Sequence, residues 1–177
     1  MRVQEKSINP HLHIDIKTAQ DMSRGKKMEI VVHMMEYSGG PVHTHLHLRN
    51  YSNRDFDAYK RIYNECFFDM RTALQRFPVD CCDSKEDLEK KRDKNFVLEI
   101  DGSLVGSVAV YGSEIDDLIV AKKFQRMGYG EALLRYAVSY LQSNSISPIV
   151  LHVADWNQGA IKMYLKNGFS IAKTEIV

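Results

Sequence analysis

The chain has 177 residues, and its 24 Lys and Arg against 23 Asp and Glu give a formal net charge of +1. This near-balance excludes a general nucleic-acid binder, which carries a basic patch or stripe. Hydrophobic residues make up 44% of the chain, no apolar stretch approaches the ~20 residues of a membrane span, and no signal-peptide core follows Met1. We therefore expect one cytoplasmic domain without a membrane partner, and the odd number of cysteines fits a reducing compartment.

The first 27 residues are polar and weakly patterned, which predicts a loosely held arm. Residues 28–37 (MEIVVHMMEY) predict a strand and residues 38–41 a turn. The segment 42–49 (VHTHLHLR) alternates strongly, so it predicts a second strand that forms a hairpin with the first.

Apolar residues at helical spacing predict an amphipathic helix over 55–68. A shorter helical piece is expected over 71–76, where Pro78 stops it. Ser84 opens a charged run of mixed sign, which predicts a solvated helix.

The second half of the chain alternates between strand and helix patterns. Asp101 and Gly102 predict a hairpin turn, and Gly168 closes the last helix. We expect strands at 95–100, 104–111, 115–120, 148–153 and 169–177, and helices at 128–142 and 157–167. This order predicts an α/β protein with a central mixed sheet and helices on its faces.

A glycine-rich turn, residues 125–130 (QRMGYG), joins the strand at 115–120 to the following helix. Glycines two apart at a helix start let the backbone approach a ligand and turn its N–H groups towards an anion such as a pyrophosphate. The turn is not a P-loop, because no Gly-Lys-Ser/Thr follows, and it lacks the third glycine of a dinucleotide-binding fingerprint.

Two motifs in this order make the chain resemble the GNAT superfamily of acyl-CoA-dependent N-acetyltransferases. The first is the family's Gln/Arg-x-x-Gly-x-Gly/Ala turn, and the second is its Asn…Ala…Tyr…Gly-Phe pattern. The matching residues are Gln125, Gly128 and Gly130, and Asn157, Ala160, Tyr164, Gly168 and Phe169. The resemblance covers residues 42–177, which we take as an N-acetyltransferase domain, with residues 1–41 as an N-terminal extension. It implies the GNAT fold: a central mixed, mostly antiparallel β-sheet flanked by helices, here with an extra N-terminal strand or hairpin.

The resemblance implies acetyl-CoA as the acyl-donor substrate. Main-chain groups of Leu118, Ile119 and Val120 are expected to hold the pantetheine arm and the acetyl carbonyl. Asn157 matches the family's cofactor-contacting asparagine, and it is also a good helix N-cap. The turn that cradles the pyrophosphate is expected to use Gln125, Arg126, Met127, Gly128, Tyr129, Gly130 and Glu131.

Transfer of an acetyl group from a thioester to an amine requires a group that accepts a proton from the amine and a group that donates a proton to the departing thiolate. Tyr164 matches the family's general acid, although its helical spacing alone indicates a core residue. Glu114 lies where some members carry a general-base glutamate, while other members use water. By alternation Glu114 and Asp116 share one face of their strand, and Asp117 faces the other way. These acids are alternatively an exposed strand end or a binding site for a cationic substrate.

The resemblance thus predicts an enzyme in which a primary amine attacks acetyl-CoA directly in a ternary complex. A route through a cysteine is disfavoured, because Cys66, Cys81 and Cys82 lie off the motif strands. The expected partners are acetyl-CoA and a small amine or peptide amine, with no nucleic acid and with a homodimer as an option. A non-catalytic acyl-CoA-binding sensor or regulatory module is the alternative function.

Two further features concern the first 50 residues and the last strand. His43, His45 and His47 share one face, and we expect a solvated or substrate-facing row and not a metal site. GNAT domains usually continue after the Gly-Phe strand into a further strand, for which Val177 leaves no room. The strand at 28–37 is therefore the predicted replacement, within the chain or exchanged with a second copy.

Overall fold

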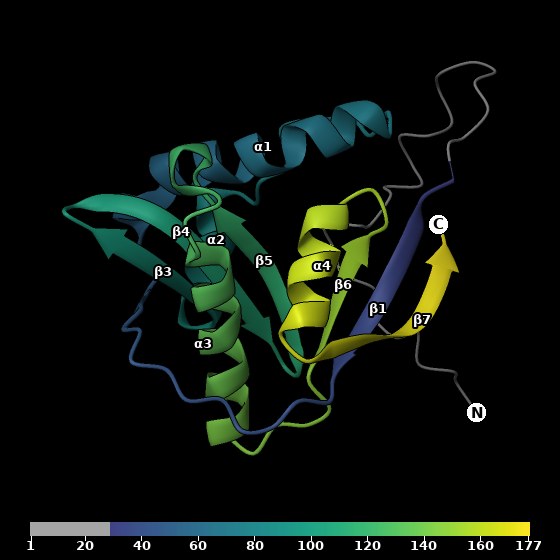
Figure 1. Cartoon of the computed structure of the whole chain (residues 1–177). Helices are drawn as coiled ribbons and strands as arrows, with labels where there is room; N and C mark the ends of the chain where they lie inside the picture. Colours follow the sequence, from purple (N-terminus) through teal and green to yellow (C-terminus); the bar gives the residue numbers. More distant parts are fainter. Residues whose placement is uncertain (1–28) are drawn as a thin grey trace, which may run out of the picture.

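The computed structural model describes residues 29–177 and contains one seven-stranded sheet with the order β2-β3-β4-β5-β6-β1-β7 (Figure 1). The strands are β1 (Val31–Tyr37), β2 (Arg49–Asn50), β3 (Asn95–Ile100), β4 (Ser103–Tyr111), β5 (Glu114–Val120), β6 (Val150–Ala154) and β7 (Phe169–Ile176). The α-helices are α1 (Phe56–Ala73), α2 (Lys85–Lys90), α3 (Tyr129–Ser143) and α4 (Gln158–Lys166). Short 3-10 turns lie at Asn53–Asp55, Arg92–Lys94 and Lys122–Phe124. The predicted arm at 1–27 lies outside the described residues.

The predicted mixed and mostly antiparallel sheet is confirmed, since β5 and β6 run parallel and the other described neighbours run antiparallel. The hairpin between β3 and β4 turns at Asp101 and Gly102, which both have positive φ (49° and 72°). The apolar stripe of α3 is buried as expected, from Leu133 to Leu141.

The predicted hairpin between 28–37 and 42–49 is wrong. β1 forms, but it pairs with β6 and β7 and lies far from β2, of which only Arg49–Asn50 pairs with a strand. The intervening segment runs along the lower end of α3 (Figure 1), where the Val42 amide donates to Oε1 of Gln142 at 2.8 Å. Its alternation is real: the apolar side chains Val42, Leu46 and Leu48 pack on the core while the histidines between them are exposed. The pattern therefore reports an extended segment lying on a helix, not a strand.

β1 occupies the position between β6 and β7 within the same chain. Its register pairs Val32 with Ala154 of β6 and with Glu175 of β7. Just beyond the strand ends, Ile30 and Val177 exchange two backbone hydrogen bonds of 2.9 Å. The replacement strand that the sequence predicted is thus supplied in cis.

The two predicted helices at 55–68 and 71–76 form one helix, α1, that continues to Ala73. The predicted charged helix is α2, and the Oγ of its N-cap Ser84 accepts a hydrogen bond from the Asp87 amide at 3.1 Å. No helix among residues 29–177 is long and apolar enough to cross a membrane.

Helix α1 crosses one face of the sheet, and α3 and α4 cover the other (Figure 1). The first half of α1 packs through Tyr59 and Ile62 onto Val97 and Ile119 of strands β3 and β5. Its last turns pack through Met70 onto the apolar cluster around Val32 of β1. The helix therefore spans the sheet from the β3–β5 side to the β1 side.

Candidate active site

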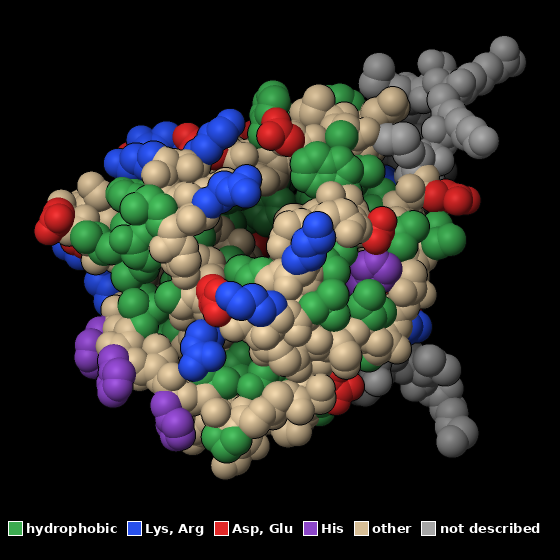
Figure 2. Space-filling view, in the orientation of Figure 1, with side chains coloured by type: hydrophobic (Ala, Val, Ile, Leu, Met, Phe, Trp, Pro, Cys, Tyr) green, Lys and Arg blue, Asp and Glu red, His purple; other side chains and the backbone are tan. Residues whose placement is uncertain are grey.

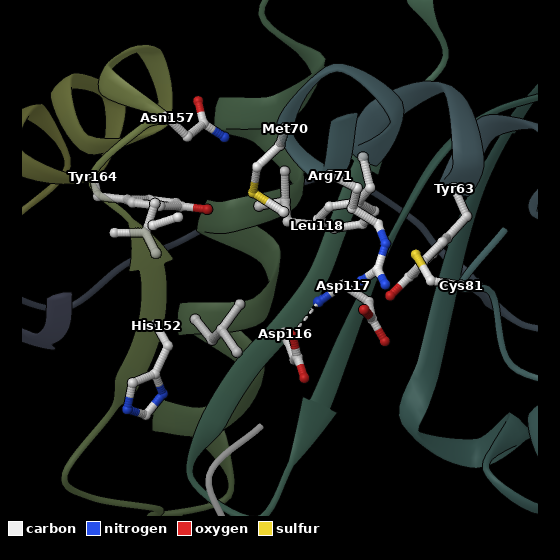
Figure 3. Close-up of a pocket in the computed structure, with 14 residues that line it drawn as sticks. Tyr63, Met70, Arg71, Cys81, Asp116, Asp117, Leu118, His152, Asn157 and Tyr164 are labelled. Atoms are coloured by element: carbon white, nitrogen blue, oxygen red, sulfur yellow. Dashed lines mark hydrogen bonds between the residues drawn. The ribbon is translucent and has the colours of Figure 1, made fainter. Parts of the chain in front are cut away.

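The sheet opens into a fork between β5 and β6. These parallel strands pair only at Glu114–Val150 and Ile115–Leu151, and then they diverge. A cavity of about 110 Å³ lies at the fork beneath α1 (Figure 3). It is lined by Tyr63, Phe67, Met70, Arg71, Cys81, Ile115, Asp116, Asp117, Leu118, His152, Val153, Ala154, Asn157 and Tyr164.

A β-bulge in β5 shapes one wall of this cavity. The pairing with β4 shifts so that two residues, Asp117 and Leu118, face one residue of β4, and Asp117 has a φ of 45°. The predicted alternation, which placed Asp117 on the face opposite Asp116, is therefore wrong, and both carboxylates line the cavity. The Asp117 amide also donates to Oδ1 of Asp116 at 2.7 Å.

Burial raises the pKa of Asp117 to about 7, although a hydrogen bond with Tyr63 acts in the opposite direction. The side chain is only 5% exposed, so the charged form loses most of its hydration. The fork thus holds one carboxyl group that changes its charge near neutral pH.

The edge of β5 beyond the bulge directs backbone groups into the fork. The Ala121 amide donates to the Val105 carbonyl at 2.9 Å, which fixes the phase of the antiparallel ladder. Main-chain groups of Ile119 therefore point towards β4, and those of Leu118 and Val120 point away from it. The Val120 carbonyl accepts hydrogen bonds from Nε2 of Gln125 at 2.9 Å and from Sγ of Cys66 at 3.4 Å. No described strand pairs with this stretch of the β5 edge past Ile115.

The glycine turn ends at the start of α3. Gly128 is the N-cap with a φ of 89°, and the preceding Arg126 also has positive φ (62°). A Cβ at Gly128 would meet no atom within 4 Å, so the backbone here is open to an approaching group. Figure 2 shows a hollow between this turn and α4 with Lys and Arg side chains at its rim. The backbone thus satisfies the conditions for an anion site at a helix start.

Helix α4 contributes two predicted site residues to the cavity. Oδ1 of Asn157 accepts from the Ala160 amide at 3.1 Å, so its predicted role as N-cap is confirmed. Tyr164 is 9% exposed and directs its hydroxyl towards the middle of the cavity (Figure 3). Burial raises the pKa of Tyr164 to about 12, with a smaller contribution from Asp116, so the phenol keeps its proton at neutral pH.

Glu114 does not line the cavity. Its Oε1 instead lies 2.7 Å from Nδ1 of His152, which does line the cavity. This hydrogen bond raises the pKa of His152 above its ordinary value, against the effect of burial. From the sequence alone His152 is either a residue that approaches the active cleft or, as is more common, a hydrogen-bonded core histidine. Neither the fork nor the diagonal contact to Glu114 leaves a local signal that decides between the two.

The cavity residues of α1 were also not predicted. Phe67 and Met70 continue the apolar spacing of the helix, and nothing in that spacing says which turns pack on the sheet and which span the fork. Among residues 29–177 no group of three or more His, Cys, Asp or Glu side chains could hold a metal ion. The three histidines of the row at His43, His45 and His47 are exposed.

Residues 56–169 match the profile of the Acetyltransferase (GNAT) family. Because the match spans well over half of the chain, the protein belongs to the GNAT family of acetyltransferases. These enzymes are acyltransferases that take their acyl group from an acyl-CoA.

Two curated relatives are similar over 93 residues each. The chain is 33% identical to peptidyl-lysine N-acetyltransferase YiaC of Escherichia coli (strain K12), over 52% of this chain and 60% of that protein. It is 25% identical to streptothricin acetyltransferase A of Bacillus subtilis (strain 168), over 50% of this chain and 54% of that protein. The chain thus spans little more than half the length of these relatives.

Solved structures show the same fold. An N-acetyltransferase from Staphylococcus aureus Mu50 superposes with a TM-score of 0.60 at 19% identity, over 72% of this chain and 84% of that chain. An acetyltransferase of the GNAT family from Colwellia psychrerythraea superposes with a TM-score of 0.62 at 12% identity, over 83% and 54%. The predicted GNAT fold is confirmed, with an added strand, β1, and without the predicted hairpin.

Proposed function

We propose that the protein transfers the acetyl group of acetyl-CoA to a primary amine by direct attack in a ternary complex. The observation that carries the proposal is the order of three features: the glycine turn at the start of α3, the edge of β5 with which no described strand pairs past Ile115, and the cavity that holds Tyr164. The amine is proposed to enter from the side of the cavity that Asp116 and Asp117 line.

The chain offers suitable groups for each part of the donor. Main-chain groups of Leu118 and the amide of Val120 would pair with the pantetheine arm, much as a strand edge binds a peptide. Ile119 is a poorer candidate, because its main-chain groups point towards β4. Asn157, at the cavity wall, can use its amide nitrogen while its Oδ1 caps α4.

The pyrophosphate would lie at the start of α3. We assign its contacts to the backbone amides of residues 126–131, since the helix dipole favours an anion at the start of α3. An alanine at Gly130 would make only ordinary contacts, 3.5 Å from Sδ of Met163, which fits the Gly/Ala choice of the motif. Gln125 would act indirectly, since its side chain holds the Val120 carbonyl. We assign the acyltransferase unit to residues 42–177, completed by β1.

Tyr164 is proposed as the general acid. A buried phenol that keeps its proton can protonate the thiolate as it departs. Proton removal from the amine is assigned to Glu114, acting from the closed end of the fork, or to water. A cationic acceptor suits the carboxylates of Asp116 and Asp117. The name of one relative, peptidyl-lysine N-acetyltransferase, likewise describes an amine acceptor.

The test is CoA release from acetyl-CoA across a panel of amines that includes polyamines, amino acids, aminoglycoside-type antibiotics and lysyl peptides. We expect turnover with at least one cationic amine and a fall in kcat of about 10²-fold in Tyr164→Phe. Tyr140→Phe is the matched control, because Tyr140 packs on Phe96 outside the cavity and should keep normal turnover. If the protein binds acetyl-CoA tightly but releases no CoA in the presence of any amine of the panel, the sensor function is favoured instead.

A further inference from the structure

The first residues beyond the last β5–β6 pair are Asp116 on β5 and His152 on β6. They form the base of the fork, and both line the cavity that Tyr164 closes from α4 (Figure 3). Glu114, by contrast, lies within the paired part of the strands and outside the cavity lining. A group that takes a proton from an acceptor in the cavity must itself line the cavity, as Asp116 and His152 do and Glu114 does not.

Glu114 has a defined partner at this position. Its carboxylate accepts a hydrogen bond from Nδ1 of His152 at 2.7 Å, and both side chains are mostly buried, with 20% and 15% exposed. A carboxylate on Nδ1 holds the proton there, so Nε2 of the neutral ring is the nitrogen that can accept a proton. The pair thus has the arrangement in which a carboxylate orients an imidazole base.

Resting on the proposed function, we propose that His152 is the catalytic base of the reaction and that Glu114 is a positioning residue that acts through it. The acceptor ammonium loses two protons on becoming an amide nitrogen. One passes to Nε2 of His152 and from there to water, which frees the nitrogen lone pair that then forms the C–N bond. The other restores the phenol of Tyr164, which protonates the sulfur as the C–S bond breaks. The proposal replaces direct proton transfer to Glu114.

Several charged or titratable groups on the neighbouring elements surround the His152 ring. Glu114 and Asp116 of β5 and Glu175 of β7 act on the ring, and all three favour its protonated form. Asp117 of β5, Arg71 of α1 and Tyr164 of α4 line the same cavity. The register partner of His152 on β1 is the uncharged Met34. The pKa of His152 therefore lies above its ordinary value. The imidazole becomes neutral, and so able to accept a proton, only as the pH rises through that pKa.

The experiment measures kcat/KM against pH for the wild type, Glu114→Gln and His152→Gln with the best amine of the panel. The wild type should show an acidic limb set by His152, and Asp117→Asn, which removes the other cavity group that changes its charge near neutral pH, should keep this limb. In Glu114→Gln the limb should move to lower pH, since the group that raises the pKa is gone, and the plateau should fall about tenfold because the ring is less well held and less basic. In His152→Gln the limb should disappear and the plateau should fall by about 10²-fold or more.

The chain supplies a matched control in a second histidine–carboxylate pair. Nε2 of His33 lies 2.9 Å from Oδ1 of Asp155, and His33 is buried but does not line the cavity. His33→Gln should leave the acidic limb in place, and thermal unfolding of all four variants would show whether the fold is kept. Nuclear magnetic resonance of the His152 ring gives a readout besides activity, with the proton of the neutral ring expected on Nδ1.

The outcomes separate the two proposals. An active wild type whose limb persists in His152→Gln, or a neutral ring with its proton on Nε2, would overturn the role of His152 and leave the acetyltransferase proposal standing. A folded wild type that binds acetyl-CoA and releases no CoA with any amine would overturn both.

Discussion

The two halves of the sheet are built in different ways. From β3 to β5 the strands follow one another along the chain and pair as antiparallel neighbours. The half formed by β6, β1 and β7 is assembled around a strand whose partners lie more than 110 residues away in sequence. The first half supplies the β5 edge of the cavity, and the second supplies His152, Asn157 and Tyr164 through β6 and α4.

The difference shows how the fork is held open. On one face of the sheet a single apolar cluster spans both halves, from Phe96 of β3 to Met35 of β1 and Phe169 of β7. On the other face α1 touches both halves and leaves the cavity between them. The halves are therefore one cooperative unit on the α3 side and separate walls on the α1 side.

The largest expected effect comes from Gly106→Ala in the first half. A Cβ at this position would lie 2.4 Å from the Ile119 carbonyl oxygen, a backbone atom that cannot move without breaking the β4–β5 pairing. We expect the free energy of unfolding to fall by about 4 kcal/mol or more. Urea unfolding measures it. Gly159→Ala on α4 is the control, since its Cβ meets only Oδ1 of Asn157 at 3.9 Å and a helical alanine should stabilise slightly.

A smaller loss is expected from Met35→Ala in the second half. Met35 is fully buried in the shared cluster, and truncation of such a side chain costs about 3 kcal/mol. Unfolding followed by circular dichroism and by the fluorescence of Trp156, the single tryptophan, should give the same transition. Two separate transitions would show that the halves unfold independently and would contradict a single cooperative unit.

An effect of opposite sign, which vanishes at low pH, is expected from Asp117→Asn at the fork. The folded chain holds the Asp117 proton up to about pH 7, whereas the unfolded chain releases it near 3.8. The aspartate therefore costs nothing below pH 4, its cost grows as pH rises towards 7, and it is constant above. The variant should be more stable than the wild type by about 4 kcal/mol at pH 8 and nearly equal to it at pH 4. Unfolding curves at the two pH values check this, and an equal effect at both would contradict it.

The same division separates the features that the sequence predicted from those that it did not predict. The Asp101–Gly102 turn, the stripe of α3 and the Asn157 cap are encoded by residues within a few positions of one another. The position of β1 depends on partners at the far end of the chain, so its strand pattern was readable but its neighbours were not.

The site shows the same limit at a finer scale. The glycine turn and Tyr164 were identifiable from their motifs. The bulge at Asp117 was not, because the extra residue is visible only against the register of β4. The pairing of Glu114 with His152 joins residues on two strands and depends on the point at which these strands separate.

The reciprocal hydrogen bonds between Ile30 and Val177 bear on the connectivity of the fold. They place the beginning of β1 beside the end of β7, as if a tight turn had been cut between two hairpin strands. A short linker joining residue 177 to residue 29, with new termini opened in the loop at 38–41, would yield a circular permutant in which β1 follows β7. Every strand would keep its neighbours, and the chain would acquire the strand order expected of a GNAT domain with its final strand at the end.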